Sequence, residues 1–186
     1  QIGSVMWVTF LFMFGFTIMH AVFILYTQMD PASGGLGFNE ADNGRIFALI
    51  GVLGIFTQGG LIGPLSRKYG SVFILRLGAI LTGIGLVMVP YSQADYMWVW
   101  LFPITGCIAI GNGLFQPSSS TLLTAMSRQE GYELGTVMGA QESLSSFARI
   151  LGPLTGGLVW TKTVGRTDFF DYHTAFHLCG ILMLCA

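Results

Sequence analysis

Long apolar runs separated by short polar segments dominate this chain. Five runs have the length of a membrane-crossing helix, which needs roughly 20 residues for a hydrocarbon core of about 30 Å. They cover about residues 6–28, 44–65, 72–91, 97–122 and 134–160. A sixth run, residues 175–186, has about 12 residues and is too short to span. The pattern predicts an all-α, polytopic membrane helical bundle with five full transmembrane helices and a truncated sixth.

Polar segments between the runs predict where the helices start and stop. Residues 30–42 contain Pro31, several glycines and acids, and neither lysine nor arginine, as is typical of an external loop. Asn43 follows this loop and is the expected N-cap of the second helix. Pro117 and the serines after it predict an interruption of the fourth helix. Residues 127–133 predict the turn that follows.

Composition places the chain in a membrane. Hydrophobic residues make up 53% of the sequence and charged residues 9%, with a mean hydropathy of +0.69. Soluble domains carry charge on roughly a quarter of their residues. A net charge of -1 argues against a nucleic-acid partner, which would require a basic patch. We therefore expect an integral membrane protein, in a plasma membrane or a bacterial inner membrane, with the lipid bilayer as its partner.

The motifs of enzymes and metal sites are missing from the sequence. It contains no Gly-x-Ser-x-Gly, phosphate loop or paired metal ligands, and its three cysteines lie in apolar runs without metal-type spacing. His173 and His177 are four residues apart, but they have no carboxylate partner at a suitable spacing. We expect neither a metal nor a cofactor, and we expect that the chain is not an enzyme.

The segment of residues 59–70 ends one apolar run with Arg67, Lys68 and the turn glycine Gly70. Because lysine and arginine favour the cytoplasmic face of a membrane, we expect this hairpin on the cytoplasmic side. It resembles the loop between the second and third helices of each half of major facilitator superfamily transporters, whose pattern is Gly-x-Leu-x-Asp-Arg-x-Gly. The matching positions are Gly63, Leu65, Lys68 and Gly70. Arg67 stands where the family has Asp, which is typical of the degenerate copy in a second half.

The fifth apolar run also resembles this superfamily. Its residues Gln141, Ser145, Arg149 and Gly152 are spaced by 4, 4 and 3, so we expect them on one helical face. The run is similar to the eleventh helix of proton-coupled antiporters of the tetracycline-resistance type, where a Gln-Ser pair, a Ser, an Arg and a Gly-Pro-Leu-x-Gly-Gly end recur in this order. The resemblance implies that the helix bends and packs through Gly152, Pro153, Gly156 and Gly157.

The resemblance implies an architecture and a function. Residues 1–186 would form the C-terminal transmembrane half of a twelve-helix transporter, with the missing N-terminal six-helix half of the same chain as a partner. Such a transporter moves a small organic solute, and we expect proton-coupled efflux of a drug or metabolite by alternating access. A small-molecule substrate and protons are the other implied partners. Arg67, Lys68 and Gly70 would act in the cytoplasmic gate region.

Glu142 departs from the antiporter pattern, in which an amide stands at this position. It lies about 10 Å into its helix, where an ionised carboxylate is costly unless a cation compensates. One hypothesis is that Glu142 binds the coupling proton or a cationic substrate. The other is a structural carboxylate, hydrogen-bonded at the cytoplasmic mouth of the bundle. Arg149 lies two turns further on, near enough for the long side chains to approach each other.

Polar residues of other helices are further candidates for binding the substrate or the proton. Those of the fourth helix share one face and either line a central cavity or bond neighbouring helices; they are Thr105, Asn112, Gln116 and Ser119. Gln58, in the second helix, is expected on the same face as the small residues Gly51 and Gly54. It either lines the cavity or packs against a neighbouring helix on that face. His20, in the first helix, is either a proton relay or a buried neutral ring with a satisfied hydrogen bond.

A structural or assembly membrane protein without transport activity is the alternative function. Its polar stripes would only hold helices together, and no solute would protect Cys107, which lies near the polar face of the fourth helix. A third alternative is a membrane-embedded enzyme, which would need a dense cluster of catalytic residues. Only Glu142 and Arg149 are candidates for such a cluster.

Overall fold

The computed structural model describes residues 1–92, 96–165 and 171–185, and these ranges contain helices and no strand. The α-helices are α1 (Ile2–Gln28), α2 (Glu40–Phe56), α3 (Ile62–Tyr69), α4 (Ser71–Met88), α5 (Met97–Glu130), α6 (Leu134–Thr163) and α7 (His173–Leu184). Short 3-10 turns cover Pro31–Ser33 and Val89–Tyr91, and a π turn, Thr57–Leu61, joins α2 to α3. The prediction of an all-α bundle is confirmed.

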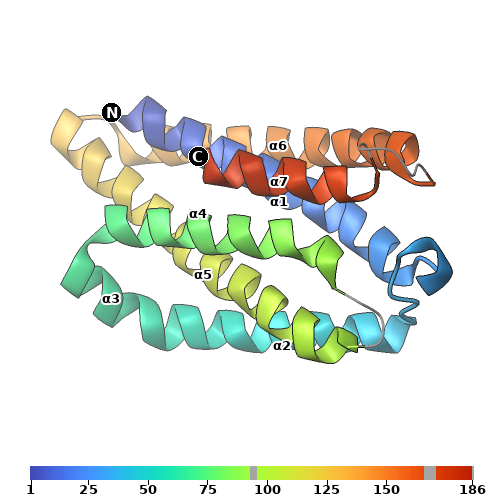
Figure 1. The fold of residues 1–186 in the computed structure, drawn as a ribbon. Coiled ribbons are helices and arrows are strands. Elements are labelled where there is room, and N and C mark those ends of the chain that lie inside the picture. The colour runs from blue at the N-terminus through green and yellow to red at the C-terminus, as the bar shows by residue number, and fades with distance from the viewer. Residues whose placement is uncertain (93–95, 166–170, 186) are drawn as a thin grey trace.

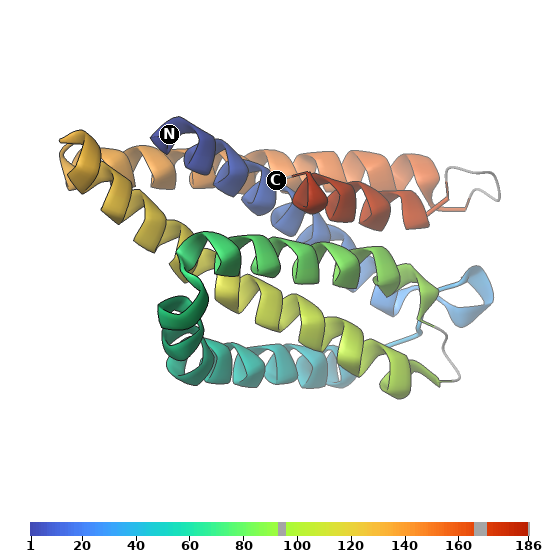
Figure 2. The same cartoon turned by 60° about the vertical axis from the view of Figure 1, so that its left-hand side comes forward.

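The helices lie side by side, and their connections alternate between two ends of the bundle (Figure 1). α1 packs on α6, α4 packs on α5, and α7 contacts both α1 and α4, so it joins the two pairs. α2 and α3 lie at the edge of this assembly, where α2 packs on α5 (Figure 2). The N-terminus, the α3–α4 turn and the α5–α6 turn share one end, and the loop of residues 29–39 lies at the other.

The predicted interruption of the fourth helix at Pro117 is wrong. α5 continues through Pro117 to Glu130, and only residues 131–133 separate it from α6. An internal proline removes one backbone hydrogen bond, and hydrocarbon offers no other partner for the groups of an unwound turn. The helix therefore persists. The hydroxyl of Thr121 donates to the Pro117 carbonyl at 2.8 Å and adds a bond at this position.

The helix that follows the predicted external loop begins before the residue predicted to cap it. The side chain of Asn39 caps α2 by accepting a hydrogen bond from the Asp42 N–H at 3.0 Å. Glu40 and Asp42 lie in the first turn, where acids interact favourably with the helix dipole. Asn43 is buried instead, and its Oδ1 accepts a hydrogen bond from Thr27 of α1 at 2.8 Å. The residue predicted as a cap thus connects two helices.

Four helical segments in the described ranges are long and apolar enough to cross a membrane. They are Ile2–Gln28, Glu40–Tyr69, Ser71–Tyr91 and Val99–Glu130. α6 has 30 residues, a sufficient length, but its polar side chains make it less apolar than these four. The fifth predicted span therefore rests on the length of α6 and on its packing along α1. α7 has 12 residues and ends partway along the bundle.

Glycines bring α4 close to its two neighbours. A methyl group added at Gly111 of α5 would lie 2.7 Å from the Gly78 carbonyl oxygen of α4. A methyl group at Gly180 of α7 would lie 2.9 Å from the Gly83 carbonyl oxygen of α4. Helices in lipid associate mainly through close packing, since hydrocarbon supplies no hydrophobic force between them. Small residues on α4, α5 and α7 therefore determine how this side of the bundle is assembled.

Gly111→Ala should destabilise the protein, because the new methyl group overlaps the backbone of α4. Overpacking of this kind costs about 1–3 kcal/mol, so the thermal midpoint should fall by several degrees in a melt of the detergent-purified protein. Gly44→Ala is the matched control, because a methyl group there meets nothing within 4 Å. Equal midpoints for the two variants would contradict the close α4–α5 approach.

Candidate functional site

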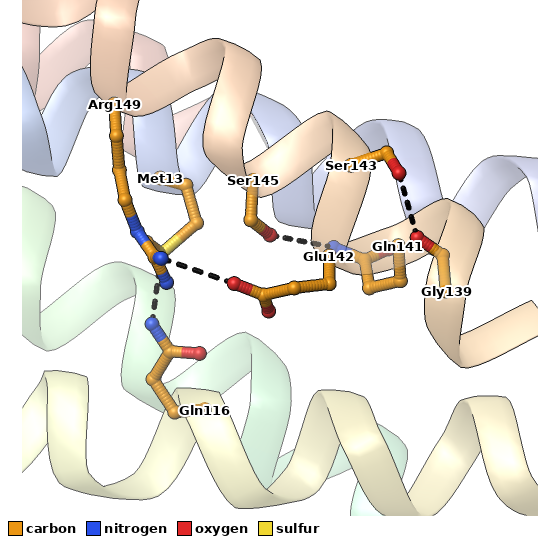
Figure 3. Close-up of polar contacts among 8 residues, drawn as sticks. All are labelled: Met13, Gln116, Gly139, Gln141, Glu142, Ser143, Ser145 and Arg149. Carbon is orange, nitrogen blue, oxygen red and sulfur yellow. Dashed lines mark hydrogen bonds and ion pairs between the residues drawn. The ribbon is translucent and has the colours of Figure 1, made fainter.

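An ion pair lies on α6, at the positions that the sequence singled out. Arg149 Nη1 and Glu142 Oε1 are 3.0 Å apart (Figure 3). A separation of seven residues is close to two helical turns, so the two side chains share a face and bridge about 10 Å. The structure therefore brings Glu142 and Arg149 into direct contact.

This ion pair is open to its surroundings. The Arg149 and Glu142 side chains are 53% and 64% exposed. At 1.5 Å per residue, Glu142 lies about 12 Å and Arg149 about 22 Å from the start of α6, well away from either end of the helix. Charged groups at such depth are costly in hydrocarbon and face water or protein in membrane bundles. This side of α6 is consequently a face for water or for further protein rather than for lipid.

The opposite side of α6 packs on α1 through small residues. A methyl group at Gly152 would lie 3.1 Å from the Ile18 N atom, and one at Gly156 would lie 3.2 Å from the Ile18 carbonyl oxygen. The Thr17 hydroxyl of α1 donates to the Ala148 carbonyl at 3.1 Å. Gly157, in contrast, has nothing within 4 Å of an added methyl group.

The four residues predicted to share one helical face, Gln141, Ser145, Arg149 and Gly152, differ in burial in the structure. Gln141, Ser145 and Gly152 are buried, and the Gln141 amide donates to the Ser145 hydroxyl at 3.3 Å. Arg149 is exposed because its long side chain turns toward Glu142 at the border of the buried stripe. Pro153 lies within α6, which runs uninterrupted from Leu134 to Thr163.

The polar stripe of α5 divides between helix contacts and the open face. Ser119 and Thr9 of α1 form a buried hydroxyl–hydroxyl bond of 2.6 Å, and Thr105 bonds the Leu101 carbonyl of its own helix at 2.7 Å. Gln116 is half-buried, and its amide donates to Met13 Sδ at 2.8 Å. In Figure 3 this amide points from α5 toward Arg149 and Glu142. Gln116 is thus the member of the stripe whose side chain lies on the side of the ion pair in this view.

A cavity between α1, α2 and α5 contains two other predicted residues. Its free volume is about 40 Å³, and it is lined by Phe16, Met19, His20 and Phe23 of α1, Phe47 and Ile50 of α2, and Thr105, Ile108, Ala109 and Asn112 of α5. The His20 ring packs against Phe16, with 4.5 Å between ring centroids. His20 is exposed overall and its ring also lines this cavity, so both predicted roles of His20, proton relay and buried neutral ring, stay open.

The remaining candidates lie apart from the ion pair. Gln58 is exposed on the π turn between α2 and α3, and α2 packs on α5. The small residues near it leave space, since a methyl group at Gly51 or Gly54 would meet nothing within 4 Å. No described helix therefore occupies the seam predicted for Gln58.

The hairpin between α3 and α4 is open as well. Its residues Gly63, Arg67, Lys68 and Gly70 are all exposed. Gly70 has a φ angle of 79°, which a glycine adopts without strain, and this explains the residue type at the turn. The Lys68 ammonium lies over the Tyr69 ring, 5.1 Å from its centroid. The hairpin shares its end of the bundle with the α5–α6 turn (Figure 1).

Sequence reasoning missed Met13 and the aromatic lining of the cavity. Positions 16, 19, 20 and 23 have the i, i+3, i+4, i+7 spacing of one helical face. This spacing identifies one face of α1, but nearly every residue of that helix is apolar, so the spacing does not distinguish this face from the others. The cavity also needs side chains from α2 and α5, and no pattern within one helix reports them.

The chain is similar to several known proteins. Residues 2–153 match the family model described as Major Facilitator Superfamily. The chain is 37% identical over 91 residues to dipeptide and tripeptide permease A of Serratia proteamaculans (strain 568), a match that covers 48% of this chain and 17% of the permease. No solved structure matches it significantly.

Two other relatives match nearly the whole chain. Multidrug resistance protein 2 of Bacillus subtilis (strain 168) is 24% identical over 177 residues, which cover 95% of this chain and 40% of that protein. The class H tetracycline resistance protein of Pasteurella multocida is 25% identical over 165 residues, which cover 89% of this chain and 38% of that protein. The chain thus spans well under half the length of these relatives.

Water should reach the side of α6 that carries the ion pair. Ser146 is exposed on that side and the adjacent Ser145 is buried, so we compare Ser146→Cys with Ser145→Cys after replacing the native cysteines by alanine. Thiols react as thiolates, which need water. A water-soluble maleimide should therefore label Ser146→Cys at least about tenfold faster in membrane vesicles. Equal labelling rates, or no labelling of either variant, would contradict a water-accessible face.

Proposed function

This chain belongs to the Major Facilitator Superfamily, and from this premise we propose that it is the C-terminal six-helix half of a twelve-helix transporter. The family predicted from residues 59–70 and from α6 is confirmed by the match of residues 2–153, and the chain is an integral membrane protein. The departure of Arg67 from the hairpin pattern supports its assignment as the second half. The share of 38–40% that the chain covers in its drug-resistance relatives supports a unit of about half the transporter's length.

We propose that the transporter exports a small organic solute in exchange for protons, by alternating access. The two halves would rock about a central site and expose it to each side of the membrane in turn. The observation that carries this proposal is the open Glu142–Arg149 ion pair, which lies far from both ends of α6. An exposed charge pair at such depth needs a reason, because an apolar face would be cheaper in a purely structural helix.

Glu142 would couple the proton to the solute. A carboxylate can bind either a proton or a cationic group, but one excludes the other, so a solute that occupies Glu142 leaves only when a proton can replace it. Arg149 would offset the carboxylate charge while the site is empty, since the two opposite charges lie 3.0 Å apart. Protonation of Glu142 would break this pair and release Arg149. Exchange then follows from competition for one carboxylate.

Neighbouring groups would complete the site. Gln116 would bind polar groups of the solute from α5, because its amide donates to Met13 and points from α5 toward the side of α6 that carries the ion pair (Figure 3). Gly152 and Gly156 would keep α6 against α1 while the face with the ion pair stays open. Arg67, Lys68 and Gly70 would act at the cytoplasmic gate, a role that rests on the hairpin pattern alone.

Glu142→Gln should abolish coupling in the full-length protein. The amide keeps the shape of the side chain but cannot take up a proton, so pH-gradient-driven efflux should fall by roughly tenfold or more. Solute exchange without a gradient should continue. The measurement uses proteoliposomes with tetracycline, ethidium and alanyl-alanine as test solutes. Full proton-driven efflux in this variant would remove Glu142 from the mechanism.

Glu133→Gln is the matched control for this experiment. Glu133 is the N-cap residue of α6, where its carboxylate accepts a hydrogen bond from Thr136 at 3.3 Å, and it lies outside the proposed site. This variant should keep proton-driven efflux near the wild-type rate. If the wild type transports none of the test solutes when a proton gradient is applied, the structural or assembly function is favoured instead.

A further inference from the structure

The outer face of α4 carries a row of exposed apolar side chains. Positions four residues apart share one helical face, and every fourth residue from position 72 to position 88 is exposed. The apolar members of this row are Val72, Ile80, Ile84 and Met88. The sides of α4 that pack on α5 and α7 use glycines for close approach, but this row has none. Lipid chains are therefore the surroundings that fit the row.

Arg76 is the exception in this row. It stands between Val72 and Ile80, and it is exposed as they are. Its Cα lies about 8 Å from the start of α4, a depth at which a charge that faces hydrocarbon is costly. Side chains of a helix tilt toward its N-terminus, and long basic side chains extend to the headgroups. We therefore expect the Arg76 guanidinium to extend toward the hairpin between α3 and α4.

This hairpin supplies two further cations. Arg67 and Lys68 lie in the last turn of α3, and both are exposed. The sequence has neither aspartate nor glutamate between Asp42 and Asp95. No described residue forms an ion pair with Arg67, Lys68 or Arg76. Three positive charges near one end of α4 are thus without an acidic partner in the described part of the chain.

Exposed aromatic rings lie beside these cations. Tyr69 and Phe73 are both exposed, and their ring centroids are 5.3 Å apart. The Lys68 ammonium lies over the Tyr69 ring. Aromatic side chains gather where the hydrocarbon of a membrane meets the headgroups, and basic residues at this level attract anionic lipids. This part of the bundle therefore has the composition of a membrane–water interface.

We propose that Arg67, Lys68 and Arg76 bind the phosphate of an anionic phospholipid, whose acyl chains lie along the apolar row of α4. The phosphate supplies the negative charge that the described residues do not, and the chains cover Val72 and Ile80. A free phosphate would match the cations but not the row beside them. The lipid also fits better than another helix, which would need small residues for close packing. This inference goes beyond the proposed function and does not depend on transport.

Brominated lipids test the identity of the occupant. Bromine on an acyl chain quenches tryptophan fluorescence at short range, so a single tryptophan reports which lipid lies beside it. We place this reporter by Phe73→Trp in the full-length protein, with every other tryptophan replaced by phenylalanine. Vesicles contain brominated phosphatidylglycerol or brominated phosphatidylcholine. The association constant should be at least about fivefold higher for phosphatidylglycerol, the factor for one basic residue at a membrane surface.

Two results with this reporter would overturn the proposal. Equal association constants would show that the cations do not select an anionic lipid. Absence of quenching by either lipid would show that protein covers the row, as expected if an acidic residue of the missing six-helix half pairs with Arg76.

Charge variants locate the preference. Arg76→Gln should lower the ratio of the two association constants by about fivefold, because one cation is removed. Arg67→Gln combined with Lys68→Gln should also lower it. Arg128→Gln is the matched control, since it removes an exposed cation from the last turn of α5, outside the row, and it should keep the wild-type ratio. An equal loss in Arg128→Gln would indicate general attraction to a basic surface and would overturn a defined site.

A second reporter tests where the lipid lies. Ile84→Trp, in the same background, is in the same row but roughly 16 Å farther along α4 than position 73. Its ratio should be near one, and a ratio equal to that at position 73 would contradict the proposed location. Soluble glycerol phosphate in large excess should not change the ratio at position 73. Displacement of the brominated lipid by this anion would show that the cations bind a free phosphate instead.

Discussion

The structure depends on one constraint, which is that polar groups inside a bilayer need partners within the protein. Threonine hydroxyls at positions 57, 82 and 105 bond carbonyls of their own helices. Thr9 and Ser119 bond each other across the α1–α5 contact. These contacts remove polar groups from hydrocarbon and permit close packing. Buried oxygens of Asn112, Ser118 and Gln141 have no partner among the described residues. The exposed ion pair also departs from this rule, and because it carries charge it needs a functional explanation.

α1 connects the two candidate regions. On one side it packs against α6, where Gly152 and Gly156 allow the close approach. On another it packs against α5, where the Phe12 and Phe115 rings stack with centroids 3.6 Å apart. Met13 of α1 accepts a hydrogen bond from Gln116, and His20 of α1 lines the cavity. A shift of α1 relative to α5 would thus alter both regions at once.

Sequence periodicity predicted the helices well because hydrocarbon demands long apolar segments, and those segments are visible residue by residue. It failed at Asn43 and Pro117, where a tertiary contact or the lack of an alternative backbone partner outweighed local preference. Helical spacing placed Glu142 and Arg149 within reach but could not determine whether they touch, because side-chain direction decides that. The cavity was not predictable, since three helices build it and spacing describes one helix at a time.

The separation of the ion pair from the aromatic cavity follows from the cost of burial. An ion pair loses hydration when it is enclosed, and its mutual attraction offsets this loss only with further hydrogen bonds. Glu142 and Arg149 avoid the loss by facing the open side of α6. A neutral amide oxygen costs far less to bury, and one donor satisfies it. The Asn112 oxygen can therefore be buried where a carboxylate would be costly.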